Sequence, residues 1–380
     1  MRLFLLCCLF ILLLPIEAQI NKTEFYEKID NQVFQYTKLH ARYPLNFDSI
    51  TNYVNLNFTT NETKVRAYYT WIALNIYYDM GRIQEINDSK RFGLRGFEST
   101  TQNPDTVLVR KLAVCEGFSK VMDKLCKASG IPSQMVVGYT KTAEGEVVRG
   151  MMHAWNAVKI DSAWGLLDVT WANGYIDSKH VYNKRFSSRY FLSPPKEFLK
   201  DHLPLDPMWQ LLLHPVSKKY FMDGDSLNEN KKSIFNFNDS IGKYLKIDKD
   251  EIQYTDYLHY YSYDPDNTEL RRTLDALVYN KAADQFNIAS IENEDFTLFF
   301  NNTILKDKSV ENFKKGKAML ESAKMYLTTG MTYLKEKKAY TKEYEKTFKE
   351  MRESGTKNLK IVQDNLSRLL KYQKEISSQK

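Results

Sequence analysis

Three residues suited to thiol chemistry occur in this chain in a fixed order: Cys115, then His153, then Asp168. Cys115 stands at the start of a predicted helix over residues 116–127. A helix N-terminus beside an imidazolium is a standard way of lowering the pKa of a thiol, and the thiolate is the useful nucleophile. The chain therefore has to fold so that the start of one helix meets two later segments at a single point.

His153 and Asp168 are predicted to lie on one face of a β-hairpin. Residues 151–160 and 163–171 are strand-like runs on either side of the turn-prone pair Asp161-Ser162. A two-residue turn makes His153 and Asp168 diagonal neighbours, about 7–8 Å apart at the backbone. A register slip by one residue would put them on opposite faces. In the predicted register, Asp168 can orient the imidazole and stabilise its charged form.

Several sequence segments resemble the transglutaminase-like superfamily, most closely the branch that contains the kyphoscoliosis peptidase and the cytokinesis-type proteins. The matching words are Tyr69-Thr70-Trp71-Ile72-Ala73-Leu74-Asn75-Ile76-Tyr77-Tyr78-Asp79, Val114-Cys115-Glu116-Gly117-Phe118, His153-Ala154-Trp155-Asn156, Leu167-Asp168-Val169-Thr170-Trp171, Tyr190-Phe191-Leu192 and Pro204-Leu205-Asp206-Pro207-Met208-Trp209-Gln210. The resemblance covers roughly residues 60–215. It implies an α+β, papain-like transglutaminase core with Cys115 as nucleophile, His153 as base and Asp168 as orienting acid.

Two classes of function remain open. The first is a cysteine-dependent acyl-transfer enzyme acting on peptide or carboxamide bonds through a thioester, with hydrolysis favoured over cross-linking. The second is a binding or cell-envelope interaction module that keeps the fold without catalysis. The backbone N–H groups at the helix start can serve as oxyanion donors, and Gln102 is the side-chain candidate for the same role. The chemistry needs no cofactor, and the sequence has no zinc-ligand spacing, phosphate loop or dinucleotide fingerprint.

The first residues have the pattern of a signal peptide. Met1-Arg2 is followed by an almost unbroken apolar run to Ile16, and cleavage is expected near Ala18-Gln19. We therefore expect a secreted, periplasmic or cell-envelope protein, with an uncleaved N-terminal anchor as the alternative. Removing residues 1–18 leaves Cys115 and Cys126, which are too far apart on one helix to form a disulfide.

The chain is long enough for two domains, with 380 residues of which 43% are hydrophobic and 27% charged. The predicted divisions are a signal peptide over 1–18, a lead-in of short helix and loop over 19–59, a transglutaminase-like domain over 60–215, a linker over 216–230 and a helical C-terminal domain over 231–380. Within the transglutaminase-like segment over 60–215, a helix is expected over 60–79 with a capping box from Thr59 to Glu62. A long loop is expected over 80–104.

The C-terminal region shows long apolar stripes at helical spacing, which predict helix-on-helix packing. The stripes are Met319, Leu320, Ala323, Leu327, Met331 and Leu334, and then Leu359, Val362, Leu366, Leu369 and Ile376. Residues 306–380 contain 19 Lys and Arg against 10 Asp and Glu, a difference of +9. We expect a protein or peptide substrate for the first domain and no nucleic acid partner. The basic helices are either a solvated face or a contact for a cell-surface or envelope partner.

Overall fold

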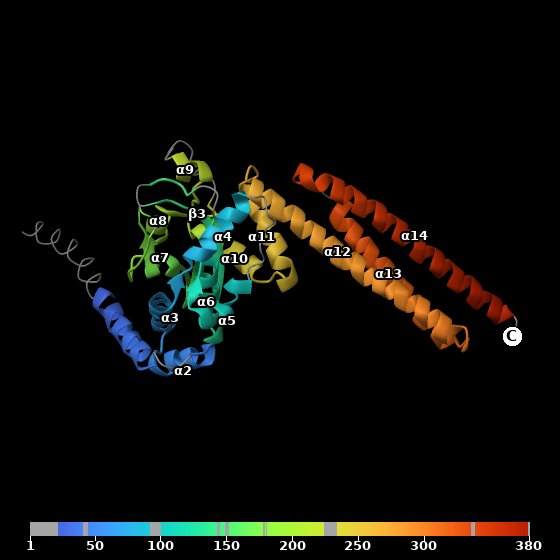
Figure 1. Ribbon diagram of the computed structural model, residues 1–380, viewed down its shortest axis with the longest axis horizontal. Helices are drawn as coiled ribbons and strands as arrows, with labels where there is room; N and C mark the ends of the chain where they lie inside the picture. Colours follow the sequence, from blue (N-terminus) through green and yellow to red (C-terminus); the bar gives the residue numbers. More distant parts are fainter. Residues whose placement is uncertain are drawn as a thin grey trace, which may run out of the picture. The chain divides into compact units, whose positions relative to one another are not determined.

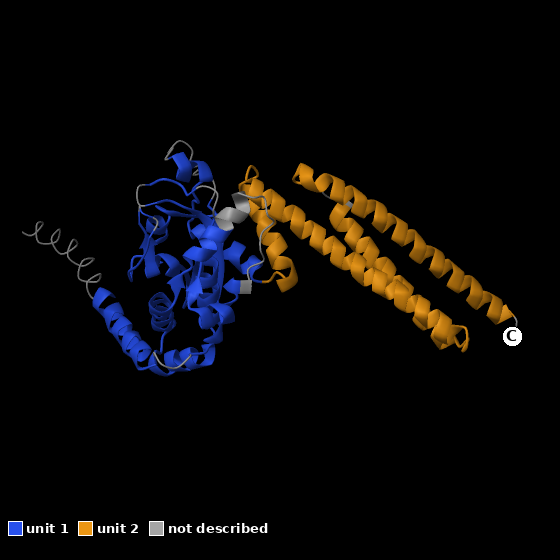
Figure 2. Cartoon of the chain, in the orientation of Figure 1, with its two compact units in different colours: residues 1–245 blue, residues 246–380 orange. Residues whose placement is uncertain are grey.

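The chain forms two compact units, residues 1–245 and residues 246–380, coloured blue and orange in Figure 2. The computed structural model describes residues 22–40, 45–91, 100–142, 145–148, 152–177, 179, 181–223, 234–335 and 339–378. The predicted signal peptide over 1–18 lies outside the described residues. Among the residues that are described, no helix is both long enough and apolar enough to cross a membrane.

The first unit is built on a five-stranded antiparallel sheet with the strand order β8-β5-β4-β3-β9. Its strands are β3 (Ser133–Thr140), β4 (His153–Ile160), β5 (Ala163–Leu167), β8 (Phe191–Ser193) and β9 (His202–Pro204). Helix α6 (Cys115–Ala128) packs against β3 and β4 (Figure 1). The apolar face of α6 is buried there through Phe118, Val121, Met122 and Leu125. The α+β fold class predicted from the sequence is confirmed for the first unit.

The predicted hairpin forms, but its second strand is shorter than expected. Ile160 pairs with Ala163 across the two-residue turn, and the last pair of the ladder is Asn156 with Leu167. The strand predicted over 163–171 is therefore wrong beyond Leu167. Asp168 instead caps a short helix, α7 (Val169–Asn173), because its side chain accepts hydrogen bonds from two backbone N–H groups of that helix.

The N-terminal segment contains more helix than the sequence indicated. Residues 22–39 are helical, and α2 (Phe47–Asn57) occupies what was expected to be a loop. Helix α3 (Asn61–Asn75) begins one residue later than predicted, since the capping box is formed by Thr60 and Thr63 rather than by Thr59 and Glu62. These helices share one hydrophobic core with α6, so the lead-in is part of the first unit's core.

The long loop expected over 80–104 is also largely helical. The structure has α4 (Met80–Arg91), the 3₁₀ helix η1 (Thr100–Gln102) and α5 (Pro104–Arg110). Asn103 caps α5 and proline occupies the first turn, which is where proline is tolerated because its missing N–H has no partner in any case. Gly93 and Gly96, which supported the loop prediction, lie outside the described residues.

Smaller elements complete the first unit. They are β1 (Tyr77–Tyr78) paired in parallel with β2 (Leu112–Ala113), β6 (Gly174–Ile176) paired with β7 (Tyr182–Lys184), α8 (Pro195–Phe198), η2 (Pro207–Gln210), α9 (Lys218–Asp223) and α10 (Phe237–Tyr244). The rings of Tyr244 and Trp209 lie 5.8 Å apart, so α10 packs with the first unit. The helical second unit accordingly begins at Lys246.

The second unit is a bundle of long helices (Figure 1). Its elements are α11 (Lys249–Tyr263), α12 (Thr268–Phe299), the π-helical turn η3 (Phe300–Ile304), α13 (Val310–Lys335) and α14 (Lys342–Ser378). The predicted stripes form its core, with Leu320, Ala323, Leu334, Val362 and Leu369 all buried. Helix-on-helix packing of the C-terminal region is confirmed.

A buried ion pair joins the helix over residues 22–39 to α3. Arg66 is fully buried, and its Nε and Nη2 donate to the two carboxylate oxygens of Asp30 at 2.8 and 2.6 Å. Nη2 also donates to Ser188 Oγ at 2.6 Å. A guanidinium taken out of water in this way depends on its partner, because an unpaired buried charge is costly.

We predict that Asp30→Leu destabilises the first unit by about 3–5 kcal/mol, because Arg66 stays buried without a carboxylate. Adding Arg66→Met should recover most of that loss, since an apolar pair needs no compensation. Lys22→Ala is the matched control: Lys22 pairs with Glu62 between the same helices but is largely exposed, so it should cost less than about 1 kcal/mol. Urea unfolding measures all three. Equal effects of Asp30→Leu and Lys22→Ala would contradict the prediction.

Candidate active site

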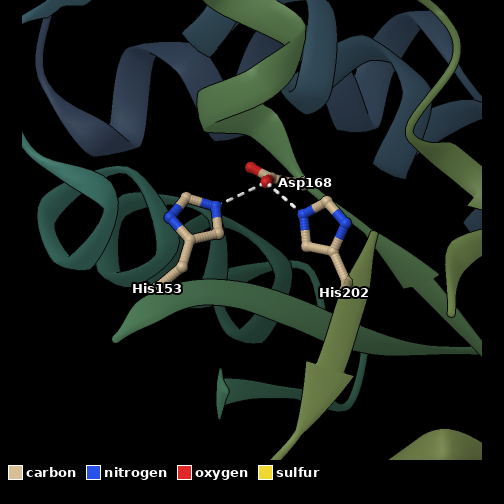
Figure 3. Close-up of side chains that lie close together, drawn as sticks. All are labelled: His153, Asp168 and His202. Carbon is tan, nitrogen blue, oxygen red and sulfur yellow. Dashed lines mark hydrogen bonds and ion pairs between the residues drawn. The ribbon is translucent and has the colours of Figure 1, made fainter. Parts of the chain in front are cut away.

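The Asp168 carboxylate stands at the centre of a buried hydrogen-bond network (Figure 3). Its Oδ1 accepts from the backbone N–H groups of Thr170 and Trp171, at 2.7 and 3.1 Å. Its Oδ2 contacts the Nε2 atoms of His153 and His202, at 2.6 and 3.1 Å. Asp168 therefore follows directly on strand β5, caps helix α7 and contacts two imidazoles.

His153 begins β4, where the predicted hairpin places it beside Asp168. Its side chain is only 11% exposed, its Nε2 lies 2.6 Å from Asp168 Oδ2, and Cys115 is near enough to act on its pKa. Burial lowers the pKa of His153. Asp168, and after it Cys115, raise this pKa by more than burial lowers it, so the net pKa lies well above the ordinary value. This imidazole is held in its charged form.

The Asp168 pKa moves the opposite way. Burial raises the pKa of this carboxyl, but the charges and hydrogen bonds of His153 and then of His202 outweigh burial and leave the net pKa below its usual range. Asp168 is thus an anion near neutral pH. It can orient His153 without taking up its proton.

Cys115 is the first residue of α6, as predicted, and is partly exposed. Val114 precedes it as the N-cap residue, and no side chain caps the helix. Cys126 lies on the same helix but is fully buried, and burial raises the pKa of its thiol far above the usual range. Both cysteines are free, which confirms the prediction that they do not bridge.

Gln102 lies directly beside the start of α6. It is buried, and its Oε1 accepts a hydrogen bond from the Val114 N–H at 2.9 Å. Its Nε2 donates to Thr101 Oγ1 at 3.3 Å. The side chain fits there because position 117 is glycine: a Cβ at Gly117 would lie 2.4 Å from Gln102 Oε1 and 2.9 Å from the Ala113 Cβ. The oxyanion role of Gln102 stays a prediction.

His202 was missed in reading the sequence. It lies on β9, which pairs with β3 so that His202 is opposite Thr140. It is fully buried, and its Nδ1 contacts Asp201 Oδ1 at 2.6 Å. The one available signal was its position just before the word Pro204–Gln210, which carries part of the family resemblance.

Aromatic side chains enclose the two imidazoles. The His202 ring centroid lies 4.4 Å from those of Trp171 and Phe198, and 5.1 Å from that of Trp155. Trp155 and Trp171 therefore pack around the site. Asn156 is buried and donates to the Ser119 backbone oxygen at 3.0 Å. That bond ties strand β4, which carries His153, to helix α6, which carries Cys115.

The atoms of His153, Asp168 and His202 that could bind a metal all lie within 4.8 Å of one another. Direct contacts fill the space between them, however, because both Nε2 atoms already contact Oδ2. A zinc ion needs about 2.0–2.2 Å to each ligand atom, so these atoms would have to move apart to admit it. We interpret the group as a hydrogen-bonded network.

Comparisons with known proteins agree with this geometry. Residues 48–169 match the family described as the transglutaminase-like superfamily. Kyphoscoliosis peptidase of Homo sapiens is 29% identical over 201 residues, 52% of this chain and 28% of that protein. Hillarin of Drosophila melanogaster is 24% identical over 180 residues, 43% of this chain and 20% of that protein. A solved structure titled as a TGase is 21% identical, with a TM-score of 0.26, over 42% of this chain and 41% of its own. The chain spans less than a third of the length of these two curated relatives.

We predict that Gly117→Ala destabilises the first unit by about 1–3 kcal/mol, because the new methyl group overlaps Gln102 Oε1 and overpacks the start of α6. Gly242→Ala is the matched control, since a Cβ at this position in α10 meets nothing within 4 Å. It should be neutral or stabilising by up to about 1 kcal/mol. Thermal unfolding of the two variants tests the pair. A neutral Gly117→Ala would show that Gln102 is not held as described.

Proposed function

We propose that this chain, whose first unit contains a transglutaminase-like domain, is a cysteine-dependent acyl-transfer enzyme acting on peptide or carboxamide bonds. One observation carries the proposal: the His153 imidazole is paired with the Asp168 carboxylate at 2.6 Å, and both Asp168 and Cys115 raise its pKa. A thiol, an imidazole and an orienting carboxylate in contact are the parts that nucleophilic catalysis requires.

In the proposed reaction, the proton on His153 is the one that Cys115 has already given up, and the resulting thiolate sulfur attacks the carbonyl carbon. The carbon–nitrogen bond then breaks, His153 gives its proton to the departing amine, and a thioester to Cys115 remains. Backbone N–H groups at the start of α6, together with the Gln102 amide, would stabilise the oxyanion. Asp168 keeps the imidazole in position and compensates its charge in each step.

Water is the favoured second nucleophile. It would attack the thioester carbon, give a proton to His153 and release a carboxylic acid, with the thiol restored. The name peptidase carried by a relative supports hydrolysis. A lysine amine in place of water would give an amide cross-link instead. In an enzyme that is secreted or held in the cell envelope, either outcome would modify proteins outside the cytoplasm.

We predict that Cys115 reacts with iodoacetamide at least about tenfold faster than Cys126 at about pH 6. Below its raised pKa, His153 is an imidazolium that can pair with a thiolate, and this pairing is lost as pH rises through that pKa. Peptide mass spectrometry of the full chain across pH gives both rates.

His153→Ala should abolish the fast reaction at the same pH. His214→Ala, at an exposed position of the first unit, is the matched control and should leave the rate unchanged. Equally slow labelling of the two cysteines would favour the alternative function, a transglutaminase-like binding module without catalysis.

We further propose that the second unit binds an anionic cell-surface or envelope partner. Residues 306–380 carry the excess of +9. The Lys346 and Lys349 side chains are 86% and 73% exposed, although they pair with Glu350 and Glu353 on the same helix at 3.7 and 4.0 Å. Exposed lysines attract an acidic surface, and salt screens that attraction over about 8 Å at physiological ionic strength.

The full chain should therefore sediment with phosphatidylserine-containing vesicles at about 50 mM salt and several-fold less at about 150 mM. Vesicles of phosphatidylcholine alone give the uncharged control. Replacing both Lys346 and Lys349 by Glu should weaken binding. If the chain fails to bind at the lower salt concentration, its basic helices are only a solvated face.

A further inference from the structure

His202 is enclosed between two carboxylates and has no other polar contact among the hydrogen bonds of the described residues. Its Nε2 lies 3.1 Å from Asp168 Oδ2, and its Nδ1 lies 2.6 Å from Asp201 Oδ1. A carboxylate only accepts hydrogen bonds, so both ring nitrogens must donate. A neutral imidazole has one N–H and would leave a lone pair facing a carboxylate oxygen. The geometry therefore requires His202 to carry a proton on each nitrogen.

The rest of the surroundings fixes the position of the His202 ring. His202 is fully buried and is walled by the rings of Trp155, Trp171 and Phe198. Asp201 is itself held by Tyr190 Oη and Arg189 Nη2, each at 3.0 Å. The network thus runs from the exposed Arg189 inward to His153.

Two cations in this network depend on one anionic oxygen. Asp168 Oδ2 serves both His153 and His202, whose ring centroids are 5.7 Å apart. The positive charge on His202 offsets part of the Asp168 charge and repels the proton on His153. The titratable groups that face this pair are Cys115, Asp168, Asp201, Tyr69, Tyr78 and Tyr190.

We propose that His202 is a positioning residue that divides the charge of Asp168 and so sets how tightly His153 holds its proton. The inference rests on the proposed function, in which His153 must release that proton to the departing amine. With Asp168 as an undivided partner, the imidazolium would be stabilised further and would be a weaker general acid. His202 weakens the hold of His153 on its proton and also fixes the position of the Asp168 carboxylate. It acts through Asp168 and contacts neither the substrate carbonyl nor the sulfur.

The decisive readout is NMR of the full chain with isotope-labelled histidine, which does not require a substrate. The chain has six histidines, so the ring signals can be assigned by single substitutions. In the unsubstituted protein near neutral pH, the nitrogen shifts of His202 should show both ring nitrogens protonated. A bare nitrogen on His202 would overturn the proposal without any variant being needed.

His202→Gln keeps a donor toward Asp168 but carries no charge, so the His153 titration should move up by about one pH unit, a tenfold tighter hold on the proton. Asp201→Asn removes the anion that faces His202 Nδ1, so His202 should lose one ring proton in the same spectra at a lower pH than in the unsubstituted protein. Tyr190→Phe is the matched control, because it removes one hydrogen bond to Asp201 without changing any charge, and it should leave the titration in place. An unmoved or lowered His153 titration in folded His202→Gln would overturn the inference. Should His202→Gln not fold, a bare ring nitrogen on His202 in the unsubstituted protein would do so.

The two proposals fail in different ways. If Cys115 labels slowly in the unsubstituted protein, the acyl-transfer function fails, whatever His202 does. If Cys115 labels fast with a dependence on His153, but His153 titrates identically with and without the His202 charge, then only the inference about His202 fails.

Discussion

The structure of the first unit depends on how Asp168 is satisfied. A fully buried carboxylate is costly unless every lone pair finds a donor, and here four donors converge on it. Two are backbone N–H groups of α7, and two are imidazoles from β4 and β9. The carboxylate can accept all four only if the chain turns at Leu167 and β9 lies beside β3. The fold of the first unit and the charges of the site therefore depend on the same buried carboxylate.

The position of Cys115 is set by packing around α6 rather than by charge. The Asn156 amide holds the helix to β4 through the Ser119 carbonyl, and the lack of a side chain at Gly117 admits Gln102 beneath the first turn. Gln102 in turn binds the N–H of Val114, the residue before the cysteine. Three short contacts thus fix the start of the helix relative to the strand that carries His153.

Features with a local period could be predicted from the sequence. The parity of His153 and Asp168 follows from the two-residue period of strands and from the turn at Asp161-Ser162, and the C-terminal core follows from helical spacing. The end of β5 could not be predicted in this way. The residues after Leu167 have strand-like composition, and only the capping bonds of Asp168 turn them into a helix.

Local sequence patterns also failed to predict the helices α2 and α4 and the role of His202, for another reason. His202 lies 34 residues from Asp168 and reaches it only because β9 adds to the far side of β3. No periodicity links those two positions. Helix α2 buries Phe47, Ile50 and Val54 in the hydrophobic core that it shares with α3 and α6.

The central claim is that Cys115 forms a covalent acyl intermediate with the help of His153. Intact-mass spectrometry of the full chain mixed with a small activated ester tests it most directly. We predict one acyl group on Cys115 within the first seconds, its loss as water completes the turnover, and no adduct with Cys115→Ala or His153→Ala. An unmodified Cys115 in a folded protein, or an adduct that forms equally well without His153, would contradict the account.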